Sequence, residues 1–359
     1  MKKISLILML TVLINILSGC SEGVAYNRFN DTFFDSFDTV TQVIGYTKTE
    51  DEFEGYMTQI HDRMLELHKL YDKYNTYEGI NNIKTINDNA GIEPVKVDRE
   101  IIDLLIFSKD MYYSTNQKTN IAFGAVLSIW SEYRDDAEFD PTNAKIPPMD
   151  KLLEAKEHTD IEKVIVDQEN MTVYLEDPEM SLDVGAVAKG FAVEIVVREL
   201  VEAGFDSWII SAGGNIRAVG QPKDPARDTW GIGIQNPDKN VFGDGSNILD
   251  TVFMNDISIV SSGDYQRYYV VDGQRIHHII DPETLMPASH YRAVNVVIED
   301  SGLADFYSTE VFLLPYQEGR DLVESVAGLE AIWVFADGTI EMTEGFREVS
   351  RSGGAIVTD

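Results

Sequence analysis

Five short segments of the sequence combine small residues with polar groups that could bind an anion, a metal ion or a proton. In the first, Gly185, Ala186 and Ala188 leave the start of a predicted helix uncrowded between Asp183 and Lys189. Backbone N–H groups at such a start attract an anion, for example a nucleotide phosphate. A helix that packs on a sheet with Asp183 as its N-cap explains the same residues equally well.

Two further segments adjoin predicted strands. Gly213, Gly214 and Asn215 follow the buried strand expected over 208–210, and paired glycines permit close approach of the backbone to a ligand or simply make a tight turn. The segment 261–269 carries hydroxyls, a glycine and an arginine before a strand, which suits an anion or a planar ring. An ordinary entry into a strand is the simpler explanation of that segment.

The last two segments offer a base and metal ligands. His277 and His278 precede a turn that Pro282 fixes, and a histidine held in a defined direction can exchange a proton near neutral pH, although a structural histidine is commoner. Asp305, Ser308 and Thr309 stand at i, i+3 and i+4 of a predicted helix, so one face carries three oxygen ligands that Mg²⁺ accepts. A capped helix with outward polar residues is an equal alternative.

Composition narrows the choice of function. The 359 residues are 44% hydrophobic, which suits a globular protein, and 61 acidic residues against 29 basic ones give a formal charge of −32. This charge repels a nucleic-acid backbone, so nucleic acid is not expected as a partner, and an anionic ligand would need a local cation. The zinc-hydrolase, P-loop, nucleophile-elbow and dinucleotide-binding motifs are all absent from the sequence.

The start of the chain indicates export. Lys2 and Lys3 precede an apolar run over 4–18, which is too short to span a bilayer and is typical of a signal peptide. The run leads to Leu-Ser-Gly before Cys20, the only cysteine, which resembles the lipidation site of bacterial lipoproteins. We therefore expect a signal peptide over 1–19, a tether over 20–33 and an extracytoplasmic location, with Cys20 anchoring the protein to the cell membrane.

Hydrophobic spacing predicts the elements that must position these groups. Apolar residues at steps of three and four predict helices over 51–75, after Asp98, over 183–204 and over 303–314. Runs rich in β-branched residues predict a hairpin over 164–175, and Asp-Gly pairs at 272–273 and 337–338 predict two-residue hairpin turns. Strands joined largely by hairpins, with inserted helices, predict an α+β fold with mixed, largely antiparallel sheets.

Taken in order, the five segments resemble the motifs of the ApbE family, the FAD:protein FMN transferases. The motifs DxGAxAKG, AGGN, SGDYxRY, HxIDPxTxxP and ADxxST all occur, and the resemblance runs from about residue 34 to about residue 336. It implies one flavin transferase domain over 34–359, with a FAD cleft between two lobes.

The resemblance also implies a reaction and its residues. FMN would pass from FAD to a Thr or Ser hydroxyl of a secreted or membrane client protein, with AMP released. His278 would act as the base, and Mg²⁺ would be held by Asp305, Thr309, Ser308 and the carbonyl of Ala186. The expected flavin and adenylate contacts are Phe37, Asn75, Thr76, Tyr77, Ala122, Phe123, Gly124, Asp183, Lys189, Gly213, Gly214, Asn215, Ser262, Gly263 and Ile279.

The sequence departs from the family pattern at three positions and leaves rival functions open. Leu285 stands where the family usually has Gly, Glu283 where it often has Arg, and Asp38 where it has Gly, while His277 is a second candidate base. A FAD pyrophosphatase would use the same site with water as the nucleophile. A flavin-binding lipoprotein would bind FAD without chemistry.

Overall fold

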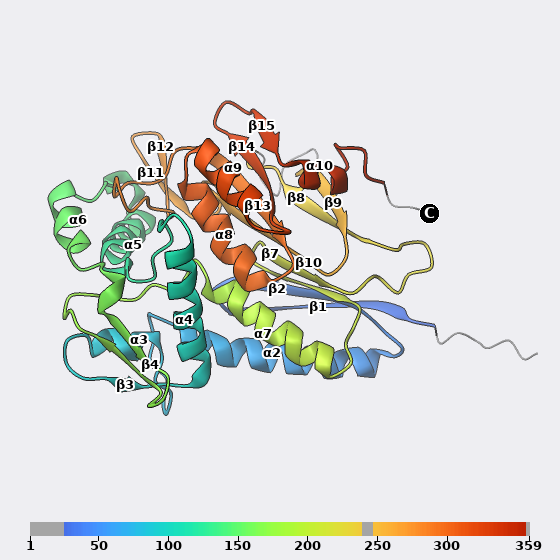
Figure 1. Cartoon of the computed structure of the whole chain (residues 1–359), viewed down its shortest axis with the longest axis horizontal. Helices are drawn as coiled ribbons and strands as arrows, with labels where there is room; N and C mark the ends of the chain where they lie inside the picture. Colours follow the sequence, from blue (N-terminus) through green and yellow to red (C-terminus); the bar gives the residue numbers. More distant parts are fainter. Residues whose placement is uncertain (1–24, 239–246, 357–359) are drawn as a thin grey trace, which may run out of the picture.

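An eight-stranded sheet organises the protein (Figure 1). The computed structural model describes residues 25–238 and 247–356. Neighbouring strands of the sheet are antiparallel throughout, so the predicted α+β class is confirmed. In spatial order the strands are β1 (Asn27–Ser36), β2 (Thr39–Thr47), β6 (Trp208–Ala212), β7 (Asn215–Val219), β10 (Ile257–Gly263), β13 (Tyr291–Ile298), β14 (Glu330–Phe335) and β15 (Ile340–Met342).

Helices cover one face of this sheet (Figure 1). They are α2 (Glu50–Tyr71), α7 (Ala188–Glu202) and α8 (Ser301–Leu313), with α9 (Tyr316–Ser325) beside α8. Helix α2 begins where Thr49 accepts a hydrogen bond from the Glu52 N–H, and it buries apolar residues at the predicted spacing. Helix α8 begins at the N-cap Asp300 and ends before Pro315, because the residue before a proline disfavours helical backbone.

The other face of the sheet is also buried. The hairpin β8 (Trp230–Gln235) and β9 (Ile248–Met254) packs there with α10 (Glu344–Val349). Because successive side chains of a strand point to opposite faces, Val260 of β10 joins the core under the helices, while Ile259 joins the core under this hairpin. The central strands are therefore held from both sides, and the residues at their ends are fixed in position.

Smaller elements form a second lobe beside the sheet (Figure 1). They are α3 (Ile83–Asp88), α4 (Arg99–Ser114), α5 (Gly124–Phe139), α6 (Met149–Lys156), β3 (Val95–Lys96), β4 (Val164–Asp167), β5 (Thr172–Leu175), β11 (Tyr268–Val271) and β12 (Gln274–His277), with short 3₁₀ helices at Pro141–Asn143 and Ile161–Lys163. The predicted hairpin over 164–175 is present as β4 and β5. The hairpin β11–β12 turns at Asp272 and Gly273, both at positive φ, as predicted.

Several predicted boundaries differ from the structure, and helix α2 ends at Tyr71 instead of at residue 75. Helix α7 begins at Ala188, not at residue 183, because the Asp183 carboxylate accepts the Gly185 N–H and closes a turn before the helix. The turn near Gly338 is longer than two residues, since β14 ends at Phe335 and β15 begins at Ile340, and Asp337 bonds the Thr339 N–H.

Residues 27–33, predicted as part of the tether, belong to strand β1, which pairs with β2. The strand is mostly exposed at the sheet edge, so its sequence lacks the alternation of apolar and polar residues that marks a half-buried strand. The predicted signal peptide and Cys20 lie outside the described residues. Within 25–238 and 247–356, none of the helices has the length and apolar character needed to cross a bilayer.

Candidate active site

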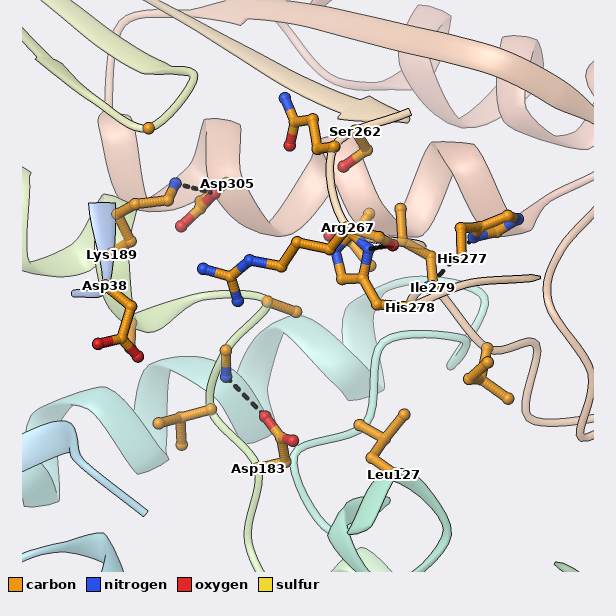
Figure 2. A pocket seen from close by; sticks show the side chains of 18 of the residues that line it. Asp38, Leu127, Asp183, Lys189, Ser262, Arg267, His277, His278, Ile279 and Asp305 are labelled. Carbon is orange, nitrogen blue, oxygen red and sulfur yellow. Dashed lines mark hydrogen bonds and ion pairs between the residues drawn. The ribbon is translucent and has the colours of Figure 1, made fainter. Parts of the chain in front are cut away.

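A cavity of about 860 Å³ lies where the two lobes meet, and it gathers most of the predicted site residues. This volume is within the range typical of small-molecule sites. The predicted residues that line it are Phe37, Phe123, Asp183, Ala186, Lys189, Gly213, Gly214, Ser262, Gly263, His278, Ile279, Asp305 and Thr309. Segments far apart in the sequence therefore converge on one pocket, as Figure 2 shows for its labelled residues.

Seven predicted residues do not line the pocket; they are Asn75, Thr76, Tyr77, Ala122, Gly124, Asn215 and Ser308. Several of them support residues that do. Asn75 and Tyr77 donate hydrogen bonds to the Asp72 carboxylate at 3.0 and 2.7 Å, and Asp72 lines the pocket. Asn215 is fully buried and accepts a hydrogen bond from Ser301.

Ser308 is not brought to the pocket with Asp305 and Thr309. Its hydroxyl donates to the carbonyl of Asp305 at 2.9 Å and bonds the hydroxyl of Ser262 at 2.9 Å. Helix α8 is buried on nearly all sides, so residues at i+3 and i+4 can face different neighbours. Ser308 therefore joins α8 to strand β10, and the pocket-facing pair on this helix is Asp305 and Thr309.

The Asp305 carboxylate is fixed by helix α7. Its Oδ2 accepts the Gly190 N–H at 2.7 Å, and its Oδ1 accepts from the Lys189 ammonium at 3.1 Å. A Cβ at position 190 would collide with the Ser301 carbonyl and the Asp305 side chain, so glycine permits α7 and α8 to approach this closely. The carboxylate is thus held at the pocket surface with a cation already beside it.

A second buried ion pair lies at the start of the loop before α7. The Lys73 ammonium contacts the Asp183 carboxylate at 2.5 Å, and each side chain is 14% exposed. Burial alone would raise the pKa of Asp183, but Lys73 and the Gly185 N–H hold this pKa below its usual range. We refer to Lys73, Asp183, Ala186, Lys189, Asp305 and Thr309 as the wall of the pocket.

The two adjacent histidines have different surroundings. His277 is buried; its Nε2 donates to the Ala288 carbonyl at 2.7 Å and its Nδ1 accepts the Ile279 N–H at 3.3 Å. His278 is half-buried at the pocket, and its Nδ1 donates to the Arg267 carbonyl at 3.2 Å. This bond leaves the lone pair on Nε2, which has no hydrogen-bonding partner among the described residues.

Burial lowers the pKa of His278 to about 4, and the nearby positive charge of Arg267 adds to the effect. The ring is therefore neutral near pH 7. Only His278 of the two candidate bases presents an unused ring nitrogen.

The β1–β2 turn closes another side of the pocket in a strained conformation. Phe37 and Asp38 have φ values of 53° and 50°, a region that side chains other than glycine rarely adopt. The Phe37 N–H donates to His68 Nδ1 at 3.2 Å, which holds the turn against α2. Both residues line the cavity. We refer to Phe37, Asp38, Arg267 and His278 as the rim.

The departures at Leu285 and Glu283 are accommodated locally. Leu285 has a φ of 62°, so it adopts the conformation for which glycine is favoured, and its carbonyl accepts a hydrogen bond from the Trp130 indole at 3.1 Å. Glu283 pairs with Lys118 at 2.7 Å. The turn after His278 therefore keeps a defined shape despite both changes.

Sequence reasoning missed several residues that line the pocket. Among them are Lys73, Lys118, Trp130 and Arg267. Arg267 lies within a segment that the sequence singled out, so its position there was a signal for it. Lys73 lies on the loop after α2 and meets Asp183 only through the tertiary fold, which the sequence pattern does not encode.

Comparisons with known proteins identify the family of this chain. A sequence model of the ApbE family matches residues 37–333. A curated protein of Treponema pallidum (strain Nichols), named FAD:protein FMN transferase, is 32% identical over 275 residues, which cover 73% of each chain. A protein of the same name from Klebsiella pneumoniae (strain 342) is 28% identical and is matched over 76% of this chain and 81% of its own.

Solved structures share the fold of this chain. The ApbE protein of Thermotoga maritima superposes with a TM-score of 0.76 and 26% identity, over 90% of this chain and 99% of its own. The flavin transferase ApbE of Vibrio cholerae, at a TM-score of 0.74 and 19% identity over 90% and 100% of the two chains, shares the fold. The chain therefore belongs to the ApbE family and is an enzyme of the transferase class.

Proposed function

We propose that this enzyme transfers FMN from FAD to a Thr or Ser hydroxyl of a client protein, with Mg²⁺ and with release of AMP. The shared name of the curated relatives supports the transfer, and the convergence of the family motifs on one pocket supports its location. The observation that carries the proposal is the His278 ring at that pocket, whose Nε2 has no hydrogen-bonding partner among the described residues.

His278 acts as the general base in this proposal. Its Nε2 takes the proton of the client hydroxyl, and the hydroxyl oxygen bonds to the FMN-side phosphorus of FAD. The bond between that phosphorus and the bridging oxygen breaks, and AMP leaves with the bridging oxygen and its electron pair. The hydrogen bond from Nδ1 to the Arg267 carbonyl keeps the ring in the required tautomer.

The wall supplies donors that fit Mg²⁺. Asp305 offers a carboxylate, Thr309 a hydroxyl and Ala186 a backbone carbonyl, all at the pocket. Among the described residues no three acidic, histidine or cysteine side chains could form a metal cluster, so the ion would rest on one carboxylate and neutral oxygens. Mg²⁺ accepts so few protein ligands, because water molecules and substrate phosphates complete its coordination. When bound, it would neutralise charge on the pyrophosphate.

The remaining residues at the pocket would position FAD. The glycines of the β6–β7 turn let the ligand approach the backbone, and the aromatic rings of Phe37 and Phe123 offer apolar surface to a planar ring. Asp183 and Lys189 add a carboxylate and an ammonium beside them. Asn75, Thr76, Tyr77, Ala122, Gly124 and Asn215 would act from behind this surface.

We also propose that Cys20 is lipidated after removal of residues 1–19, which would place the enzyme outside the cytoplasmic membrane beside secreted or membrane clients. The support is the sequence pattern that ends at this single cysteine. In cells fed a labelled fatty acid, the wild-type protein should carry the label and fractionate with membranes. Recovery of an unlabelled, membrane-free Cys20→Ser protein would support the anchor; a wild type without label would contradict it.

Product analysis tests the proposed reaction. The enzyme is incubated with FAD, Mg²⁺ and a client that carries a Thr acceptor, and the client is examined by intact mass spectrometry. A client heavier by FMN, with one AMP released per adduct, is the expected result. Free FMN and AMP with an unmodified client would indicate a pyrophosphatase, and bound but intact FAD would indicate a flavin-binding protein; either outcome would overturn the proposal.

A further inference from the structure

The positive charges that line the pocket differ in whether they are paired. Four of them have a carboxylate within 4 Å: Lys73 with Asp183, Lys118 with Asp281 and Glu283, Arg134 with Asp135, and Lys189 with Asp305. Arg267 also lines the pocket, yet its guanidinium has no ion pair and no hydrogen bond within the described ranges 25–238 and 247–356. Among the described cations of this lining, Arg267 is therefore the one that a ligand can reach without breaking an ion pair.

The position of Arg267 is fixed by its backbone. Its carbonyl accepts two hydrogen bonds from His278, from the N–H at 3.2 Å and from Nδ1 at 3.2 Å. Asp264, three residues earlier, bonds Arg292 through its carboxylate at 2.7 Å and through its N–H at 3.0 Å. The segment is therefore anchored on both sides of Arg267, while the side chain is left exposed to the cavity.

Figure 2 shows where the side chain points. It extends from beside His278 across the pocket, toward the side on which Lys189 and Asp38 lie. Its guanidinium thus lies between the proposed base and the wall. An anion placed there would touch the lining cation that has no partner in the described part of the chain. A phosphate suits the planar fork of a guanidinium, which can donate two parallel hydrogen bonds.

We propose that Arg267 binds the FMN-side phosphoryl group of FAD, the group on which the client hydroxyl acts. This inference rests on the proposed function and assigns one of its contacts. The phosphoryl group lies nearest the base during transfer. Arg267 is held beside that base, because its backbone carbonyl accepts a hydrogen bond from His278 Nδ1. The guanidinium would orient the phosphoryl oxygens and offset their charge without displacing an existing ion pair.

Binding of four ligands to Arg267→Gln tests the contact without turnover. Riboflavin, FMN, AMP and FAD are titrated by calorimetry or flavin fluorescence in the presence of EDTA, so that no metal takes part. A hydrogen bond to a charged group contributes about 1.5 to 3 kcal/mol, so FMN and FAD should bind about 10- to 100-fold more weakly. Riboflavin and AMP, which lack that phosphoryl group, should bind as they do to the wild type.

Two further variants complete the test. Arg275→Gln removes the same charge from the neighbouring strand β12, where the side chain does not line the pocket, and it should leave all four affinities unchanged. Arg267→Lys keeps the charge but loses the two-pronged geometry, so it should restore only part of the FMN affinity. Circular dichroism of each variant checks that the fold is intact.

The outcomes separate the contact of Arg267 from the proposed function. Equal FMN affinity in the wild type and in Arg267→Gln would overturn this inference and leave the proposed function standing. Weaker AMP binding with unchanged FMN binding would also overturn it, since the contact would then lie on the leaving group. A wild type that binds no flavin at all would contradict the proposed function itself.

Discussion

The wall and the rim of the pocket differ in how their polar groups are satisfied. In the wall, Asp183 and Asp305 each have a cationic partner and a backbone N–H, and behind the wall Ser308 is bonded to the neighbouring strand. In the rim, the Arg267 guanidinium and the His278 Nε2 have no partner among the described residues, and Phe37 and Asp38 hold strained backbone. The difference indicates that the wall is prepared by folding, whereas the rim keeps groups free for the substrates.

The largest expected effect comes from changing the wall. Asp305→Asn removes the only carboxylate of the proposed metal site, and charge stabilisation by a metal contributes several kcal/mol, so the rate of adduct formation should fall by about 10³-fold or more. The measurement is the initial rate of FMN transfer at saturating Mg²⁺. Asp300→Asn is the matched control, since Asp300 caps the same helix outside the pocket and Asn is an equally good cap. A loss smaller than tenfold in Asp305→Asn would break the assignment.

The second-largest effect is expected on stability, and it distinguishes a buried ion pair from an ion pair on the surface. Asp183→Asn leaves the Lys73 ammonium buried without its counter-charge, so the free energy of unfolding should fall by about 3 kcal/mol or more. Asp88→Asn removes one partner of the exposed Lys84 pair and should cost less than about 0.5 kcal/mol. Urea unfolding measures both. An equal loss of unfolding free energy in the two variants would show that the Lys73–Asp183 ion pair is no more desolvated than an ion pair on the surface.

A smaller effect is expected where the β6–β7 turn supports the rim. Gly213 has a φ of 53°, and a Cβ there would collide with Thr39 beside the strained turn. Gly213→Ala should lower the free energy of unfolding by about 2 kcal/mol, through backbone strain and this contact. Gly328→Ala, at a φ of 77° with open space around it, should show the strain alone, about 1 kcal/mol. If the two substitutions lower the free energy of unfolding equally, the close approach of Gly213 to Thr39 is unimportant.

The smallest expected effect is on pH dependence. A base works when unprotonated, and the pKa of His278 lies at about 4, so lowering the pH from 8 to 6 leaves the ring neutral. The kcat/KM for FAD should therefore change by less than about twofold over this range and should fall only as the pH approaches about 4. A protonation step near the ordinary histidine value of about 6.5 would contradict the environment described for the rim.

Local sequence patterns predicted the parts of the site that depend on local structure. The glycine turn at Gly213 and the position of His278 at a strand end follow from short-range spacing, and both reach the pocket. Ser308 does not line the pocket, because spacing along a helix does not tell which neighbour each side faces when the helix is buried almost all round, so its role as a metal ligand stays a prediction. The pairing of Lys73 with Asp183 depends on tertiary contact between distant segments.

Whether a charged side chain has an ion-pair partner could likewise not be predicted from the sequence. Lys189 and Arg267 both belong to recognised motifs, but only the folded structure shows that the ammonium is paired with Asp305 while the guanidinium has no ion pair with any residue the structure describes. An edge strand was also missed, since β1 exposes most of both faces and pairs through its backbone. A group whose role depends on having no partner can therefore be recognised only from the three-dimensional structure.

The most direct test of the central claim is FMN transfer by His278→Ala, measured by intact mass of a Thr-containing client with FAD and Mg²⁺, alongside the FAD affinity of the same variant. Loss of a general base should lower the transfer rate by at least about 10²-fold, while FAD affinity stays within about threefold of the wild type. Transfer at a rate near that of the wild type would contradict the role of His278 and, with it, this account of the rim.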